Sequence, residues 1–220
     1  METIYQDRVD AGQRLARALE RYAGPETLVL GVPRGGVVVA AEVARALEAP
    51  LDVVIARKIG APHEPEFAIG AVVSGEGGVL LDEPAIRYLQ VPAEFIRRET
   101  ERQEAEIRRQ MALYRGDRPV PELAGKTVIV VDDGIATGYT LRAALAGLRR
   151  QDPERLVVAA PVGPGSVCRE FRQLADDVIC LRMPEPFVAV GAWYADFDQT
   201  EDAEVIRLLR TQAEQPAPAR

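Results

Sequence analysis

This chain has few of the residues on which metal-binding and redox motifs depend. Its 220 residues include two cysteines, Cys168 and Cys180, one histidine, and two lysines, Lys58 and Lys126. The cysteines lack the spacing of a metal site, so we expect reduced, buried or half-buried thiols in a cytoplasmic protein. The histidine, His63, has no identifiable partner in the sequence and is expected on a surface loop rather than in a catalytic role.

Long hydrophobic runs and basic clusters are missing as well. No stretch is long and apolar enough to span a membrane, and the first residues show no signal-peptide pattern. The net charge is −7 and no basic run appears, which argues against nucleic acid as the main partner. We therefore expect neither a membrane nor a nucleic acid as a partner. With 47% hydrophobic residues, the chain can form one core with room for a small appended lobe.

The most informative stretch runs from Thr127 to Leu141, T-V-I-V-V-D-D-G-I-A-T-G-Y-T-L. Its first five residues are β-branched and uncharged, which is typical of a strand buried on both faces of a parallel sheet. Asp132 and Asp133 follow at the point where such a strand ends. A turn with two glycines then leads into a helical pattern of leucines. The order is strand, acid pair, glycine-rich turn and helix.

That order suits the binding of a sugar phosphate. The turn can direct several backbone N–H groups at one point, and the start of the helix adds the positive end of its dipole, which together favour an anion. Gly134 and Gly138 allow close approach of the backbone, and Thr137 and Thr140 offer hydroxyl donors. The two ionised carboxylates only accept hydrogen bonds, so they suit a pair of sugar hydroxyls. The stretch therefore predicts a ribose 5-phosphate site; the alternative is an ordinary strand-to-helix turn capped by Asp and Thr.

The stretch resembles the signature of the type I phosphoribosyltransferases, which is a hydrophobic strand, two acidic residues, three variable residues and Thr-Gly-x-Thr. The fixed positions are met by Asp132, Asp133, Thr137, Gly138 and Thr140. The resemblance implies that the two acids bind the ribose hydroxyls of phosphoribosyl pyrophosphate (PRPP) and that the next loop binds its 5-phosphate. That loop comprises Gly134, Ile135, Ala136, Thr137, Gly138, Tyr139 and Thr140. It also implies Mg²⁺ as cofactor, which the two acids would hold indirectly, through PRPP or water.

A second glycine-rich turn, Gly31-Val32-Pro33-Arg34-Gly35-Gly36, follows an expected strand over Glu26 to Leu30. Gly35 and Gly36 can present N–H groups, and Arg34 supplies a permanently charged donor. Taken alone, such a turn is more often structural. It resembles the family's pyrophosphate-binding loop, which implies that Arg34, Gly35 and Gly36 bind pyrophosphate and that a non-proline cis peptide bond lies near Arg34.

Arg57 and Lys58 follow a strand expected over Leu51 to Ala56. With Gly60 they resemble the Arg-Lys-x-Gly stretch of adenine phosphoribosyltransferases, in which basic residues at the base of a mobile loop approach pyrophosphate. The resemblance implies pyrophosphate binding by both residues and a catalytic role for Lys58, together with Arg34, in stabilising the leaving group. The alternative is a solvated basic pair after a strand.

The stretch from Met183 to Thr200 is similar to the purine-binding end of hypoxanthine phosphoribosyltransferases. The similarity implies that Phe187 stacks on the acceptor and that the backbone of Val188 binds its edge. The alternative is a hydrophobic cover over the edge of the sheet. One departure is that Ala136 stands where those enzymes carry an aspartate thought to act as the general base. The identity of the acceptor is therefore left open.

Alternating strands and helices predict an α/β fold with a doubly wound, mainly parallel sheet and ligands at its carboxyl edge. The family resemblance implies five core strands with a small hood. We expect a single domain over residues 1–210, with a core at about 26–181 and a hood or acceptor region at about 183–200. A charged helical insertion at about 84–116 is expected to be an exposed helix or a homodimer contact, and residues 211–220 a disordered tail.

Two functions are compatible with these patterns. The first is a PRPP-dependent phosphoribosyltransferase, a glycosyltransferase of nucleotide metabolism, that moves ribose 5-phosphate to a nitrogen acceptor such as a nucleobase and releases pyrophosphate. The second is a regulatory protein that senses PRPP with little catalysis. Arg34 and Lys58 favour the enzyme, because a sensor needs only the phosphate and ribose contacts.

Overall fold

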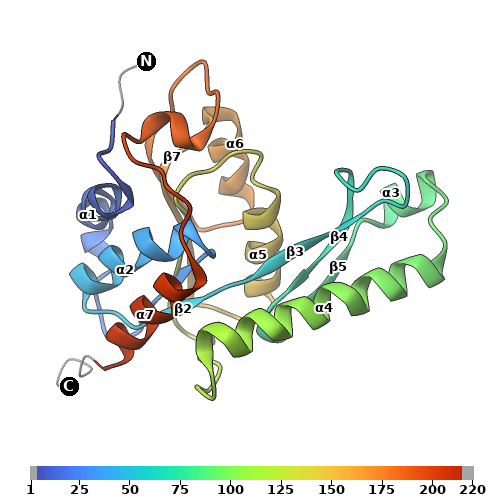
Figure 1. The fold of residues 1–220 in the computed structure, drawn as a ribbon, viewed down its shortest axis with the longest axis horizontal. Coiled ribbons are helices and arrows are strands. Elements are labelled where there is room, and N and C mark those ends of the chain that lie inside the picture. Colours follow the sequence, from blue (N-terminus) through green and yellow to red (C-terminus); the bar gives the residue numbers. More distant parts are fainter. Residues whose placement is uncertain (1–3, 215–220) are drawn as a thin grey trace.

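A five-stranded parallel sheet forms the centre of the molecule, as the computed structural model shows for residues 4–214 (Figure 1). Its strands follow the order β2-β1-β6-β7-β8, and each neighbouring pair is parallel. Their bounds are β1 Thr27–Gly31, β2 Leu51–Val53, β6 Thr127–Val131, β7 Arg155–Val162 and β8 Asp177–Arg182. The predicted fold class is confirmed.

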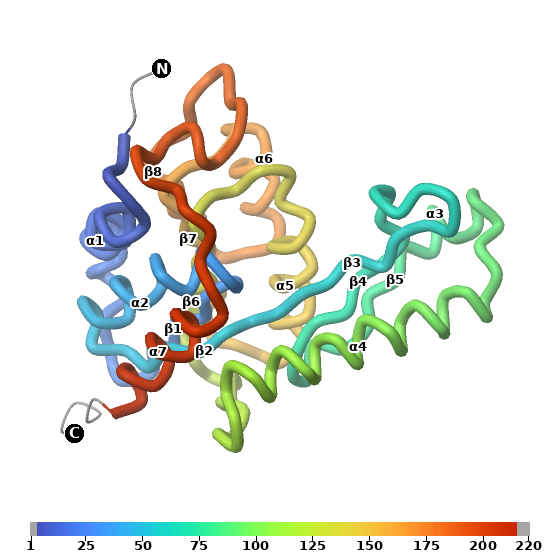
Figure 2. The backbone as a smooth tube through the Cα atoms, in the orientation of Figure 1, coloured from blue at the N-terminus to red at the C-terminus, as the bar shows by residue number. Residues whose placement is uncertain are grey.

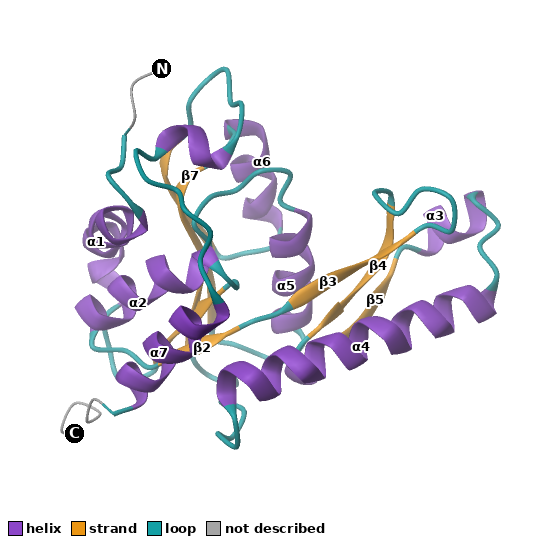
Figure 3. Cartoon of the chain, viewed as in Figure 1, coloured by secondary structure: helices purple, strands orange, loops and turns teal. Residues whose placement is uncertain are grey.

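Helices cover both faces of this sheet (Figure 3). The side chains of β6 alternate, so Ile129 and Val131 pack in one core cluster while Val128 and Val130 pack in another. The first cluster includes residues of α1 (Arg8–Leu19), α2 (Gly35–Leu47) and α7 (Asp202–Ala213). The second includes residues of α5 (Tyr139–Arg149) and α6 (Gly165–Glu170). The uncharged β-branched run of β6 is therefore explained by burial on both faces.

A smaller antiparallel sheet extends away from the main one and lies along a long helix (Figure 2). It consists of β3 (Ala56–Gly60), β4 (Ala68–Val73) and β5 (Gly78–Leu81). A hairpin around Ser74 to Gly77 joins the last two of these strands. The expected strand over Leu51 to Ala56 differs, because β2 ends at Val53 and β3 begins at Ala56.

The charged insertion forms two helices, α3 (Glu83–Tyr88) and α4 (Ala93–Arg115). The break lies just before Pro92, which is the N-cap of α4, since a proline disfavours helical backbone in the preceding residue. At the other end of the chain, residues 211–213 belong to α7 rather than to a disordered tail, and residues 215–220 lie outside the described part. No helix within residues 4–214 has the length and apolar character needed to cross a membrane.

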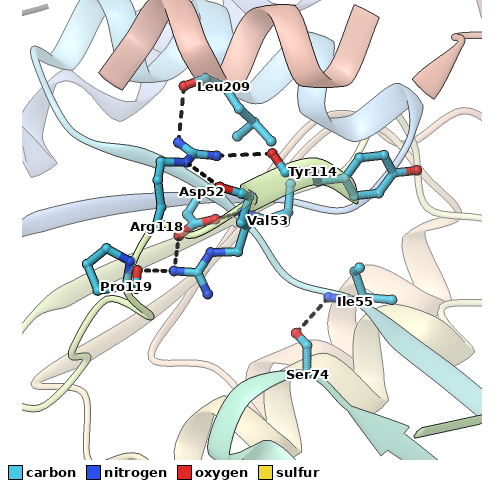
Figure 4. A network of polar contacts seen from close by, with 9 residues as sticks. Asp52, Val53, Ile55, Ser74, Tyr114, Arg118, Pro119 and Leu209 are labelled. Atoms are coloured by element: carbon cyan, nitrogen blue, oxygen red, sulfur yellow. Dashed lines mark hydrogen bonds and ion pairs between the residues drawn. The ribbon is translucent and has the colours of Figure 1, made fainter. Parts of the chain in front are cut away.

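Buried polar contacts join the end of α4 to the main sheet and to α7 (Figure 4). Arg115 Nη2 lies 3.0 Å from Asp52 Oδ2, and the two side chains are only 5% and 12% exposed. Arg118 donates hydrogen bonds to the backbone carbonyls of Tyr114 and Leu209. These contacts fix α4 relative to β2 and α7, and so they set the position of the residues that α4 presents near the sheet edge.

Replacing Arg115 with methionine should lower the free energy of unfolding by about 3 kcal/mol, because the buried Asp52 loses its partner. Burial already raises the pKa of Asp52 above its usual value. A carboxyl with a raised folded-state pKa contributes stability below its unfolded-state pKa and loses it as the pH rises. The loss in free energy of unfolding caused by Arg115→Met should therefore be smaller at about pH 4 than at about pH 7, as measured by urea denaturation.

The control for this prediction is the double variant Asp52→Asn/Arg115→Met, which removes the titrating group. It should recover most of the lost stability at neutral pH and show less of the pH dependence. Equal stabilities for the single and double variants at both pH values would contradict the role given to the buried pair.

Candidate active site

The two glycine-rich turns meet at the carboxyl edge of the sheet, where β1 and β6 lie side by side. A Cβ atom on Gly35 would lie 2.0 Å from Asp133 Oδ2, and one on Gly36 would lie 2.9 Å from the Cα of Asp132. Only glycine permits this approach at either position without a shift of the neighbouring loop. The structure thus brings the acid pair into contact with the loop that carries Arg34.

The acid pair has a distinct electrostatic environment. Asp132 Oδ1 accepts a hydrogen bond from the backbone N–H of Asp133 at 2.9 Å. Burial, and then the neighbouring charge of Asp133, raise the pKa of Asp132 well above its usual value, while the positive charge of Arg8 opposes this rise. A diol that contacts the acid pair would therefore meet one acid, Asp132, whose pKa is well above its usual value.

Arg8, the first residue of α1, contacts the second acid directly. Its Nε lies 2.7 Å from Asp133 Oδ2, and the side chains are 12% and 16% exposed. Its Nη1 donates to the carbonyl of Asp198 at 2.7 Å, and its guanidinium lies 3.9 Å from the centre of the Phe197 ring. Arg8 thus joins the acid pair to the C-terminal segment. It was not predicted as a site residue, because nothing in the sequence connects it to a residue 125 positions away.

Tyr194 also supports the acid pair from the C-terminal segment. Its hydroxyl donates to the carbonyl of Asp133 at 2.5 Å, and burial raises the pKa of this hydroxyl. Its ring packs against Tyr5, whose hydroxyl donates to the carbonyl of Pro161 at 2.8 Å. Tyr194 lies in the aromatic stretch after Met183, for which the sequence predicts a role in acceptor binding instead.

The loop after the acid pair has the expected strand-to-helix form. Gly138 has a φ of 75°, and a Cβ there would lie 2.8 Å from the Phe171 ring, so this position requires glycine. The exposed residues of the loop region are Ala136, Thr137, Tyr139 and Thr140. Ile135 differs from the prediction, because its side chain is buried and its N–H donates to the carbonyl of Val162 at 2.8 Å. It anchors the loop and does not offer its N–H to a ligand.

The predicted pyrophosphate residues are only partly brought together. The Pro33–Arg34 peptide bond is cis, as expected. Arg34 and Arg57 line the same cavity, of about 470 Å³. Lys58 lines a different cavity, beside α5, and its Nζ lies 2.6 Å from Glu66 Oε2. The reason is that both residues lie on β3, where successive side chains point to opposite faces.

Phe187 and Val188 do not form a recognisable acceptor pocket. The Phe187 ring stacks on Trp193 with centroids 6.4 Å apart, and the side chain of Val188 is exposed. With Tyr5, Trp193 and Tyr194, Phe187 belongs to a small hydrophobic cluster at this end of the molecule. That packing agrees with the alternative interpretation of this stretch as a hydrophobic cover.

Within the described residues, no three His, Cys, Asp or Glu side chains form a group that could hold a metal ion. A dedicated protein cage for a cation is therefore not found in this part of the chain. The acid pair fits the other common arrangement for Mg²⁺, in which one or two carboxylates act together with phosphate oxygens of a substrate and with water.

Comparisons with known proteins identify the family of this chain. A family model described as the phosphoribosyl transferase domain matches residues 2–194. Two Mycobacterium tuberculosis proteins, whose names place them provisionally among the phosphoribosyl transferases, are 42% identical over 207 residues, covering 94% of this chain. The aligned region is 46% of each relative, so the chain spans about half of their length.

A solved structure is also similar over nearly the whole chain. The crystal structure of TT1426 from Thermus thermophilus is 43% identical, with a TM-score of 0.84, and the match covers 96% of this chain and 99% of that one. The extent of the family match and the acid pair with its glycine-rich loop at the end of β6 lead to one conclusion: the chain belongs to the phosphoribosyl transferase domain family.

Proposed function

We propose that this chain is a phosphoribosyltransferase that moves ribose 5-phosphate from PRPP to a nitrogen acceptor and releases pyrophosphate. The observation that supports the proposal is the contact of the acid pair with Gly35 and Gly36, the two residues that follow Arg34, at the edge of the sheet where β1 and β6 end. Asp132 and Asp133 accept hydrogen bonds from the ribose hydroxyls. Thr137, Thr140 and the N-terminus of α5 bind the 5-phosphate.

In the proposed reaction, the bond between ribose C1 and the pyrophosphate oxygen breaks, and its electron pair leaves with pyrophosphate. The lone pair of the acceptor nitrogen forms the new bond to C1, and the proton that this nitrogen carried passes to solvent water. Arg34, assisted by Arg57 in the same cavity, stabilises the negative charge that develops on the leaving group. The acid pair and the phosphate loop hold the sugar in place, so the protein acts mainly by positioning and electrostatics.

The proposed cofactor is Mg²⁺. When bound, it neutralises charge on the pyrophosphate oxygens. The residues that would hold it are Asp132 and Asp133, through PRPP or water, because the described part of the chain offers no larger ligand group.

The test of this function is pyrophosphate release from PRPP with magnesium and a panel of nitrogen acceptors that includes purine and pyrimidine bases. We expect release that depends on at least one acceptor, together with the matching ribonucleoside 5-phosphate. Binding of PRPP without release for any acceptor would support a PRPP sensor instead. The panel has to be broad, because Ala136 offers no general base to a purine nitrogen.

Replacing Arg8 with methionine should weaken PRPP binding about tenfold, because Asp133 loses the charged partner that holds its carboxylate in place. Arg8→Lys should recover part of the affinity, since it keeps the charge but lacks the guanidinium that contacts both Asp133 and the carbonyl of Asp198. Equilibrium binding of PRPP measures both effects, and a melting curve of each variant serves as the control for folding. Unchanged affinity in a folded Arg8→Met protein would show that Arg8 has no part in the site.

A further inference from the structure

Part of the lining of the cavity that contains Arg34 and Arg57 comes from helices α4 and α7, outside the five-stranded sheet. The cavity measures about 470 Å³, and α4 contributes Arg109, Gln110 and Tyr114 to its lining. The start of α7 contributes Asp202. Three arginines and one acidic residue therefore border this space, which leaves an excess of positive charge among the described lining residues.

The groups from α4 and α7 are linked to Arg34 by direct contacts. The Tyr114 hydroxyl donates to Asp202 Oδ1 at 2.5 Å, and Arg34 Nη1 lies 3.8 Å from the same oxygen. Burial and the bond to Asp202 raise the pKa of Tyr114, while the charges of Arg34 and Arg109 both oppose the rise. Arg34 and Arg109 therefore both act electrostatically on the Tyr114 hydroxyl, one from the loop after β1 and one from the inserted helix.

We propose that α4 is part of the pyrophosphate site and that Arg109 binds the outer phosphate of the pyrophosphate group. This inference rests on the proposed function, in which pyrophosphate is the leaving group. In the structure Asp202 is the anion that Arg34 faces. When pyrophosphate binds, it replaces Asp202 as the anion that faces Arg34, and it interacts with Arg34, Arg57 and Arg109 together. The insertion thereby acquires a binding role that its sequence, a run of charged helical residues, does not indicate.

The existing ion pairs of Arg34 and Arg109 can be exchanged at small cost. Arg109 pairs with Glu106 at 2.8 Å, but its side chain is 60% exposed. Arg34 and Asp202 are 37% and 42% exposed at their longer separation. Exposed pairs of this kind contribute little to stability, whereas a charge-assisted bond to a phosphate oxygen in a shared cavity is stronger. A phosphate group therefore competes well for both guanidinium groups.

The test compares Arg109→Met with Arg102→Met in calorimetric titrations with inorganic pyrophosphate and, separately, ribose 5-phosphate. Arg102 is a matched control, since it lies on α4 and also pairs with a glutamate three residues earlier, at 2.6 Å, but does not line the cavity. We expect Arg109→Met to bind pyrophosphate about tenfold more weakly, as the loss of one charge-assisted contact predicts, with ribose 5-phosphate affinity unchanged. Arg102→Met should match the wild type for both ligands.

A second variant of the same site is expected to increase the affinity for pyrophosphate. Asp202→Asn keeps an oxygen that accepts from Tyr114 but removes the competing negative charge, so it should bind pyrophosphate several-fold more tightly. Equal pyrophosphate affinities for the wild type and Arg109→Met would overturn the role of Arg109. If the wild type binds ribose 5-phosphate but no pyrophosphate, the cavity is not a pyrophosphate site. If it binds neither ligand, the proposed function fails as well.

Discussion

Replacing Asp132 and Asp133 together with asparagine should weaken PRPP binding at least about a hundredfold. Each carboxylate that accepts a hydrogen bond from a ribose hydroxyl contributes about 1.5–3 kcal/mol, so losing both charges removes about 3 kcal/mol or more. Asparagine has nearly the same shape, so the contact with the glycines of the neighbouring loop is kept. Its amide nitrogen is a donor where the diol needs an acceptor, which adds to the loss.

The measurement is equilibrium binding of PRPP with magnesium to the double variant and to each single variant. Because Asp133→Asn also removes the ion-pair partner of Arg8, each variant is denatured in urea to establish that it is folded. This separates a loss of binding from a loss of folding. A folded double variant that retains wild-type affinity would show that the acid pair does not bind the ribose.

Replacing Arg34 with methionine should lower kcat about 100- to 1,000-fold, which is the typical effect of removing one donor that stabilises developing negative charge. The affinity for ribose 5-phosphate should stay the same, because that ligand lacks the pyrophosphate group. Arg34→Lys should remain well below the wild type, since lysine keeps the charge but lacks the planar fork that binds two phosphate oxygens.

The matched control is Arg45→Met, because Arg45 lies in the last turn of α2 and its side chain is 54% exposed. It removes a positive charge from the helix that begins just after Arg34, but at the end away from the site. Its kcat should equal that of the wild type. An unchanged kcat in Arg34→Met would contradict the role of Arg34. The residues that stabilise the leaving group would then have to be others in the same cavity, such as Arg57 and Arg109.

The central part of the fold could be predicted because its signals are local. Five β-branched residues followed by two acids and a glycine-rich turn define β6 and the start of α5 without reference to the rest of the chain. The same holds for the turn after β1. The pairing of the two loops then follows from the parallel sheet, because parallel strands end at the same edge.

The remainder of the site depends on contacts between distant segments. Arg8 reaches Asp133 across 125 positions, and Tyr114 reaches Asp202 across 88, so neither pair has a sequence signature. From the sequence, Arg57 and Lys58 form one basic pair after the strand expected over Leu51 to Ala56. In the structure both lie on β3, where the alternation of side chains separates them, and only Arg57 joins Arg34.

The measurement that tests the central claim most directly is a calorimetric titration of the wild-type protein with PRPP in the presence of magnesium. The proposed site predicts saturable binding of one PRPP per chain, with a dissociation constant of about 1 mM or below, and competition by ribose 5-phosphate and by pyrophosphate. Absence of binding by a folded protein would contradict it, and would leave a chain that shares the family's fold without its ligand.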